Sequence, residues 1–297
     1  MKDKQANENV KIVVLPTAVR RTYGARETNQ IQKVIMDRLL LPSREPYHKV
    51  QVAVKHRPDG RPEALVAYML RAYTYTADVV KMKVDETYGV LSVDMAYRGE
   101  DDYEEMPLPD IPAKRIRPVD MVFGTPVPDI KTAREGVEAA CKTAASAGYK
   151  VVKLLGKDAN VANYRRYLSG HLKAFGNIGH GNTGGIVLYD GNLASAWFSS
   201  LAKKGLWPEV IYFNSCQVFN APLQPAIMAA GARTFVGGKV NLKIGPSEEV
   251  FKCFWIKVLK MAAKMGMALK TCEKEKYPIQ NAHGISGDLG KFLPIPT

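Results

Sequence analysis

The chain has 297 residues, of which 46% are hydrophobic and 24% are charged, and it carries a net charge of +13. This composition is ordinary for a soluble globular protein, and the length predicts one large domain or two unequal ones. No apolar run reaches the roughly 18 residues that span a bilayer, and the polar start lacks the apolar core of a signal peptide. We therefore expect no membrane partner and a cytoplasmic location, or a secreted one if a leader was removed.

Four cysteines show neither C-x-x-C spacing nor the framework of a small secreted scaffold: Cys141, Cys216, Cys253 and Cys272. The default expectation is reduced thiols. Three of the four, Cys141, Cys253 and Cys272, fall in helical runs and are expected to be packing thiols.

Positive charge gathers near the C-terminal end, where seven lysines meet only two acids: Lys252, Lys257, Lys260, Lys264, Lys270, Lys274 and Lys276 against Glu273 and Glu275. They follow a helical pattern with few aromatic residues between them, which argues against a nucleic-acid partner. The pattern favours a solvated helix face. Its alternative is an electrostatic docking surface for an acidic partner.

The N-terminal third has the periodicity of a β-rich unit. Residues 10–16 predict a short strand stopped by Pro16, and helical spacing over residues 31–39 ends before Pro42. From Val50 onward the period is two, and the strand-like runs are residues 50–54, 65–75, 79–84 and 90–97. These runs predict an antiparallel meander.

A proline-rich stretch over residues 107–118 cannot form a continuous helix or ladder, so it predicts a boundary between two units. The expected division is an accessory unit with its linker at residues 1–117 and a second domain at residues 118–297. The linker presents Lys114, Arg115 and Arg117 in what should be an exposed strip.

Beyond the boundary, strands and helices alternate, which predicts a mostly parallel sheet covered on both faces. Expected strands are residues 119–125, 149–155, 172–178, 186–189, 210–213 and 234–240. Expected helices are residues 130–147, 159–168, 193–204, 223–230 and one long helix over residues 248–274. The third strand is the weakest, because Gly176 and Asn177 interrupt it.

Two chemically active side chains follow strands of this sheet, at the edge where ligands of such sheets bind. They are His180, in Gly179-His180-Gly181, and Cys216, in Asn214-Ser215-Cys216. A thiol attacks as a thiolate, and a nearby imidazole can activate it and later protonate a leaving amine. Gly181 lets a carbonyl approach the backbone closely, so the N–H groups of Gly181 and Cys216 are the expected oxyanion donors.

The segment from Gly179 to Cys216 resembles the core of the caspase-like (clan CD) cysteine peptidases, which include caspases, metacaspases, legumain, clostripain, gingipains and separase. The likeness is greatest to the clostripain, gingipain and metacaspase group. Those enzymes place His-Gly after one strand and Cys after the next core strand, as His180-Gly181 and Cys216 stand here. The resemblance implies a caspase-like α/β/α sandwich with a mostly parallel sheet, preceded here by the β-rich accessory unit. It also implies peptide-bond hydrolysis by a Cys216–His180 dyad that needs no metal or organic cofactor.

In that family the side chain on the acyl side of the cleaved bond (P1) contacts three loops. Here these loops hold residues 125–129, Asn214 and residues 239–243. A carboxylate at Asp129 would accept a basic P1 side chain, unless Asp129 is the N-cap of the following helix. A pocket made by Lys239 or Lys243 would instead accept an acidic one. We lean toward a basic P1, in which case the enzyme itself would cut at Lys114, Arg115 or Arg117.

Three other interpretations compete. Gly179 to Gly184 satisfies G-x-G-x-x-G, but a dinucleotide site needs a helix after it and an extended run follows. A glutaminase-like amidotransferase places its Cys before its His and on a glycine-rich elbow, whereas here the order is reversed. The third is a non-catalytic caspase-like scaffold that binds an acidic partner or nucleic acid through its basic surface.

The other histidines have no metal-site spacing and are expected to be solvated or structural: His48, His56, His171 and His283.

Overall fold

A computed structural model of the chain describes residues 11–14, 35, 47–56, 62–84, 91–97, 119–170, 172–201, 208–278, 281–290 and 293. The chain divides into two compact units, Met1–Pro107 and Leu108–Thr297. Lys114, Arg115 and Arg117 lie outside the described residues, as does the predicted helix over residues 31–39 apart from Ile35. Among the described residues, no helix is long and apolar enough to cross a membrane.

Within the described part of the first unit, the strands form one sheet in the order β1-β2-β3-β4-β5. The bounds are β1 Lys11–Val14, β2 Tyr47–His56, β3 Pro62–Arg71, β4 Ala77–Val84 and β5 Leu91–Tyr97. The predicted antiparallel meander is confirmed from β2 to β5, and β1 pairs parallel to β2.

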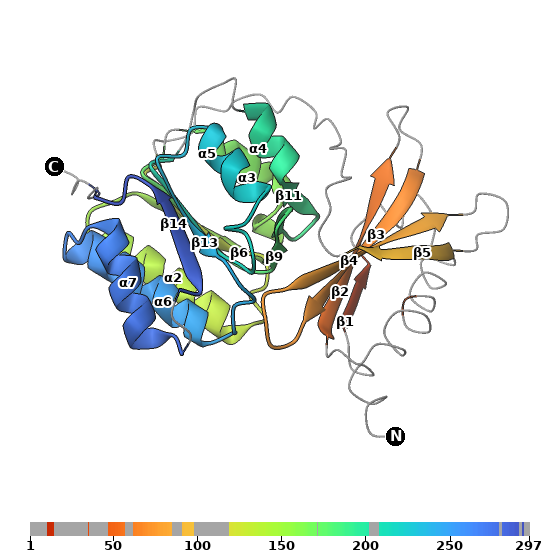
Figure 1. The fold of residues 1–297 in the computed structure, drawn as a ribbon, viewed down its shortest axis with the longest axis horizontal. Helices are drawn as coiled ribbons and strands as arrows, with labels where there is room; N and C mark the ends of the chain where they lie inside the picture. The colour runs from red at the N-terminus through yellow and green to blue at the C-terminus, as the bar shows by residue number, and fades with distance from the viewer. Residues whose placement is uncertain are drawn as a thin grey trace. The chain divides into compact units, whose positions relative to one another are not determined.

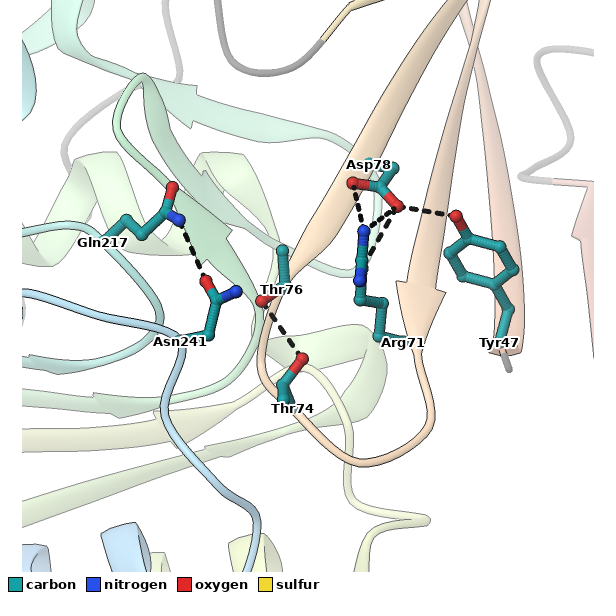
Figure 2. A network of polar contacts seen from close by, with 7 residues as sticks. All are labelled: Tyr47, Arg71, Thr74, Thr76, Asp78, Gln217 and Asn241. Carbon is teal, nitrogen blue, oxygen red and sulfur yellow. Dashed lines mark hydrogen bonds and ion pairs between the residues drawn. The ribbon is translucent and has the colours of Figure 1, made fainter. Parts of the chain in front are cut away.

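A half-buried polar cluster joins the β3–β4 hairpin to β2 (Figure 2). The Arg71 guanidinium pairs with the Asp78 carboxylate at 3.0 Å, and the Tyr47 hydroxyl donates to the same carboxylate at 2.6 Å. A planar guanidinium facing a carboxylate gives two parallel, charge-assisted hydrogen bonds. The contact between Arg71 and Asp78 therefore helps to fix the register of β3 with β4.

The described part of the second unit is built on a six-stranded sheet in the order β14-β13-β12-β8-β6-β7. The bounds are β6 Met121–Thr125, β7 Val151–Leu155, β8 Ala174–Ile178, β12 Val210–Asn214, β13 Thr234–Gly238 and β14 His283–Gly287. Every neighbouring pair is parallel except β13 with β14. A small antiparallel sheet, β9 Gly181–Asn182, β10 Gly185–Val187 and β11 Asn192–Ala194, follows β8.

Helices cover both faces of the large sheet (Figure 1). The helices α3 Val161–Leu168, α4 Ser195–Leu201 and α5 Leu223–Ala229 lie on one face, and α2 Lys131–Ser146, α6 Pro246–Lys260 and α7 Met265–Lys276 lie on the other. The first face buries an aliphatic and aromatic core that includes Phe175 and Phe213, while Phe123 and Trp255 meet edge to face on the second. The predicted α/β/α sandwich with a mostly parallel sheet is confirmed.

The long helix predicted over residues 248–274 is wrong, because the chain folds back between α6 and α7. Ala262 adopts a left-handed backbone conformation (φ 47°) at the break. A continuous helix would hold Cys253 and Cys272 about 28 Å apart, whereas their Cα atoms lie 5.7 Å apart in a disulfide. The expectation of reduced packing thiols is therefore wrong for these two cysteines, and Cys141 and Cys216 are the free cysteines of the described chain.

The strand β14 was missed by the sequence patterns. It is antiparallel to β13, with His283 opposite Gly238 and Gly287 opposite Thr234. Its sequence, HGISG, has two glycines and no alternation of apolar residues. Long-range pairing with β13 forms this strand, because its own β-propensity is weak.

Candidate functional site

His180 and Cys216 leave the sheet from neighbouring strands at the same height. In the parallel pair of β8 and β12, Ile178 lies opposite Asn214. His180 and Cys216 each come two residues after this last pair, and both side chains are fully buried. The carboxyl ends of parallel strands share one edge of the sheet, so both groups belong to that edge.

The interruption of β8 by glycine and asparagine has a structural cause. A Cβ on Gly176 would lie 2.6 Å from the Phe123 ring, so this position must stay without a side chain. The buried Asn177 accepts a hydrogen bond from the Tyr164 hydroxyl at 2.6 Å and donates to the Ser215 hydroxyl at 3.4 Å. The strand that precedes His180 is thereby bonded to the residue that precedes Cys216.

The two free cysteines have different surroundings. Burial raises the pKa of the Cys141 thiol, on α2, to about 12, so this group stays protonated near neutral pH. At Cys216 the backbone N–H of Leu242 donates to Sγ at 3.0 Å. The sulfur also faces the Leu242 carbonyl oxygen at 3.8 Å, as a thiol donor would, so both backbone polar groups of Leu242 contact the Cys216 sulfur.

The turn that carries Cys216 is bonded to the loop after β13. Gln217 has a left-handed backbone (φ 57°), and its N–H donates to the Val240 carbonyl at 3.2 Å. Its side-chain amide donates to Asn241 Oδ1 at 2.9 Å (Figure 2). Together with the Leu242 contact to sulfur, these bonds hold the loop over residues 239–243 beside the thiol.

Gly181 is packed too closely against its neighbours to carry a side chain. A Cβ there would lie 2.8 Å from Val218 Cγ1 and 3.0 Å from Ser215 Cβ. Val187 donates across the β9–β10 pair to the His180 carbonyl, which makes Gly181 and Ile186 a non-hydrogen-bonded pair. In such a pair the N–H of Gly181 points away from β10, as an oxyanion donor would have to.

The predicted specificity residues lie in three different settings. Asp129 is exposed after β6, and the N-cap alternative is wrong because Ile130 is the N-cap of α2 and makes no side-chain cap bond. Lys239 is exposed, with its ammonium group 5.8 Å from the centre of the Phe219 ring. Asn214 is fully buried, and its Oδ1 lies 3.1 Å from Nε2 of His283.

His283 and Glu273 are the residues near Cys216 that sequence reasoning missed. His283 is buried on β14, and its Nδ1 lies 2.9 Å from Oε1 of Glu273 on α7. The available signal was a histidine between Ala282 and Gly284 in a stretch with no helical period. That signal is weak, because the strand order that brings it to Asn214 is not visible in the sequence.

No model of a known protein family and no curated protein matches this chain. Among solved structures, the chain is similar to a crystal structure of the Arg-specific cysteine proteinase gingipain R (RGPB), at 12% sequence identity and a TM-score of 0.49. The match covers 60% of this chain and 48% of the gingipain R chain, so it spans about half the length of that protein.

The close packing at Gly181 gives a first prediction. Replacing Gly181 with Ala forces Val218 or Ser215 to move, and overpacking of this kind costs about 1–3 kcal/mol of unfolding free energy. Urea denaturation measures this cost. Gly191→Ala is the matched control, since its added Cβ meets Val161 Cγ2 at an ordinary 3.5 Å. Equal stability of the two variants would contradict the prediction.

Proposed function

We propose that this protein is a cysteine peptidase of the caspase-like kind, with Cys216 as nucleophile and His180 as general acid and base. The observation that carries the proposal is the placement of both groups two residues past paired ends of neighbouring parallel strands. The Leu242 N–H on the sulfur adds to it, because such a donor stabilises a thiolate once the proton has left. The reaction class that suits a thiolate, an imidazole and backbone donors on one sheet edge is acyl transfer.

In this mechanism the Cys216 thiolate bonds to the carbonyl carbon of the scissile peptide, and the carbonyl electron pair moves to oxygen. The N–H groups of Gly181 and Cys216 stabilise that oxyanion, and each such donor contributes about 3 to 4 kcal/mol in enzymes where one has been removed. As the C–N bond breaks, the protonated His180 gives its proton to the leaving amine. His180 then takes a proton from water, which hydrolyses the thioester and releases the thiolate.

Reporter peptides with Arg, Lys, Asp or Asn at P1 test the proposal on the whole chain. The wild type should cleave at least one of them, and Cys216→Ala should lose on the order of 10⁶-fold in rate. Iodoacetamide near neutral pH should label Cys216 faster than Cys141, since the Cys141 thiol is protonated. His180→Ala should slow the labelling of Cys216 alone. Absence of both cleavage and preferential labelling would instead favour the non-catalytic scaffold.

For specificity, we propose that Asp129 binds a basic P1 side chain. Its support is that Asp129 is exposed on the loop after β6, at the same edge of the sheet, and does not cap α2. A charge-assisted hydrogen bond contributes about 1.5–3 kcal/mol. Asp129→Asn should therefore lower kcat/KM for Arg and Lys reporters by about 10- to 100-fold and leave Asn reporters unchanged. The matched control is Asp158→Asn, another exposed carboxylate; an equal loss in both variants would refute the role of Asp129.

A basic P1 preference makes Lys114, Arg115 and Arg117 candidate sites of self-cleavage. Purified wild type should lose intact mass on incubation, with new termini at one of these three residues, while Cys216→Ala stays whole. Mass spectrometry of both proteins over time measures this. An intact wild-type chain that still cleaves reporter peptides would contradict self-processing and leave the peptidase proposal standing.

A further inference from the structure

A chain of buried polar groups runs from α7 through β14 to the end of β12. Nδ1 of His283 lies 2.9 Å from Oε1 of Glu273, and Nε2 lies 3.1 Å from Oδ1 of Asn214. Glu273 also accepts the backbone N–H of His283 at 2.6 Å. Glu273, His283 and Asn214 are 6%, 3% and 0% exposed, respectively. Burying groups of this kind is costly unless they are paired, and here the pairing ends two residues before Cys216.

The two ring nitrogens of His283 face different partners. Nδ1 faces a carboxylate oxygen of Glu273, and Nε2 faces Oδ1 of Asn214. The amide oxygen of Asn214 therefore lies on the His283 side. The amide nitrogen Nδ2 is thereby turned away, and it is buried with no hydrogen-bond partner among the residues that the structure describes.

The contact between His283 and Asn214 spans the end of β13. Gly238 pairs with His283, and the preceding Gly237 pairs with Phe213, so Gly238 lies between His283 and Asn214. The imidazole therefore reaches across β13 at a position that carries no side chain. The rings of Tyr212 and Tyr277 pack nearly perpendicular to the imidazole, with centroids 6.1 and 5.7 Å away, and fix its plane.

The same region also supports the other side of the thiol. The Tyr277 hydroxyl accepts the N–H of Lys243 at 2.8 Å, next to Leu242, whose N–H donates to Sγ. Residues from α7 to β14 therefore hold both the strand end before Cys216 and the loop that contacts its sulfur.

We propose that Glu273 and His283 form a positioning pair for the peptidase reaction. The pair fixes the Asn214 amide, holds the end of β12 that carries Cys216, and presents Nδ2 of Asn214 as a donor to an oxygen of the bound peptide. This inference rests on the proposed function, and it adds residues that do not touch the reacting atoms themselves.

The test compares His283→Ala, His283→Gln and Glu273→Gln in the full chain. A displacement of about 1 Å at reacting groups costs on the order of 100-fold in rate, so His283→Ala should lower kcat on the best reporter peptide by that order, with a smaller change in KM. Gln places an N–H where Nε2 stands, so His283→Gln should recover most of the loss. Glu273→Gln should fall between the two.

Ser286→Ala is the matched control, because it removes a hydrogen bond with Gln224 from the same strand, away from Asn214. It should keep wild-type kcat. Labelling of Cys141 reports on the fold of each variant, since loss of structure exposes that thiol as well. The inference is overturned if His283→Ala and Ser286→Ala behave alike, or if His283→Gln is no better than His283→Ala.

Failure of this inference is distinguishable from failure of the proposed function. A wild type that cleaves reporters and loses activity in Cys216→Ala, but not in His283→Ala, overturns only the positioning pair. A wild type that neither cleaves reporters nor labels Cys216 faster than Cys141 overturns both.

Discussion

The site depends on the parallel pairing of β8 with β12. Five residue pairs join the strands, from Ala174 with Val210 to Ile178 with Asn214. A slip of one residue would turn every side chain of a strand to the opposite face, and would move His180 out of step with Cys216. The buried Asn177 opposes such a slip, because it bonds Tyr164 on one side and Ser215 on the other. An unsatisfied buried amide costs about 1–3 kcal/mol, so the polar residue that weakens the strand pattern also specifies its register.

On the β13 side of Cys216, two glycines rather than polar side chains hold the cysteine turn in place. A Cβ at Gly238 would lie 2.4 Å from the Ser215 carbonyl oxygen, and one at Gly237 would lie 2.8 Å from Val218 Cγ2. The two glycines let the cysteine turn lie against β13, where the loop over residues 239–243 bonds to it. Cys216 is thus fixed by polar bonds toward β8 and by close backbone approach toward β13.

Sequence patterns predicted those elements whose structure depends on residues close together in the chain. The β-meander of the first unit, the alternation of strands and helices in the second, and the two strand ends that carry His180 and Cys216 follow from periodicity and turn residues. The predictions that failed concern contacts between residues far apart in the sequence. No proline marks the break between α6 and α7 in the sequence. Cys253 and Cys272 come close enough to form a disulfide only when the two helices fold back on each other. The weak strand β14 exists because β13 pairs with it, so the role of His283 was hidden with it.

Buried polar side chains concentrate at one edge of the large sheet. Most buried polar residues of the large sheet lie where parallel strands end, at Thr125, Asn177, Asn214 and Ser215, or where the antiparallel β14 begins, at His283, whereas Thr234 lies at the start of β13. The strand interiors are instead filled by side chains such as Phe175, Phe213 and Phe235. Apolar residues of similar size would pack at this edge without the cost of desolvating amides, hydroxyls and the His283–Glu273 pair. Buried polar groups that lower stability are typical of functional sites, where they orient other groups for chemistry. The cluster around Cys216 is therefore an argument for the proposed site that does not depend on His180.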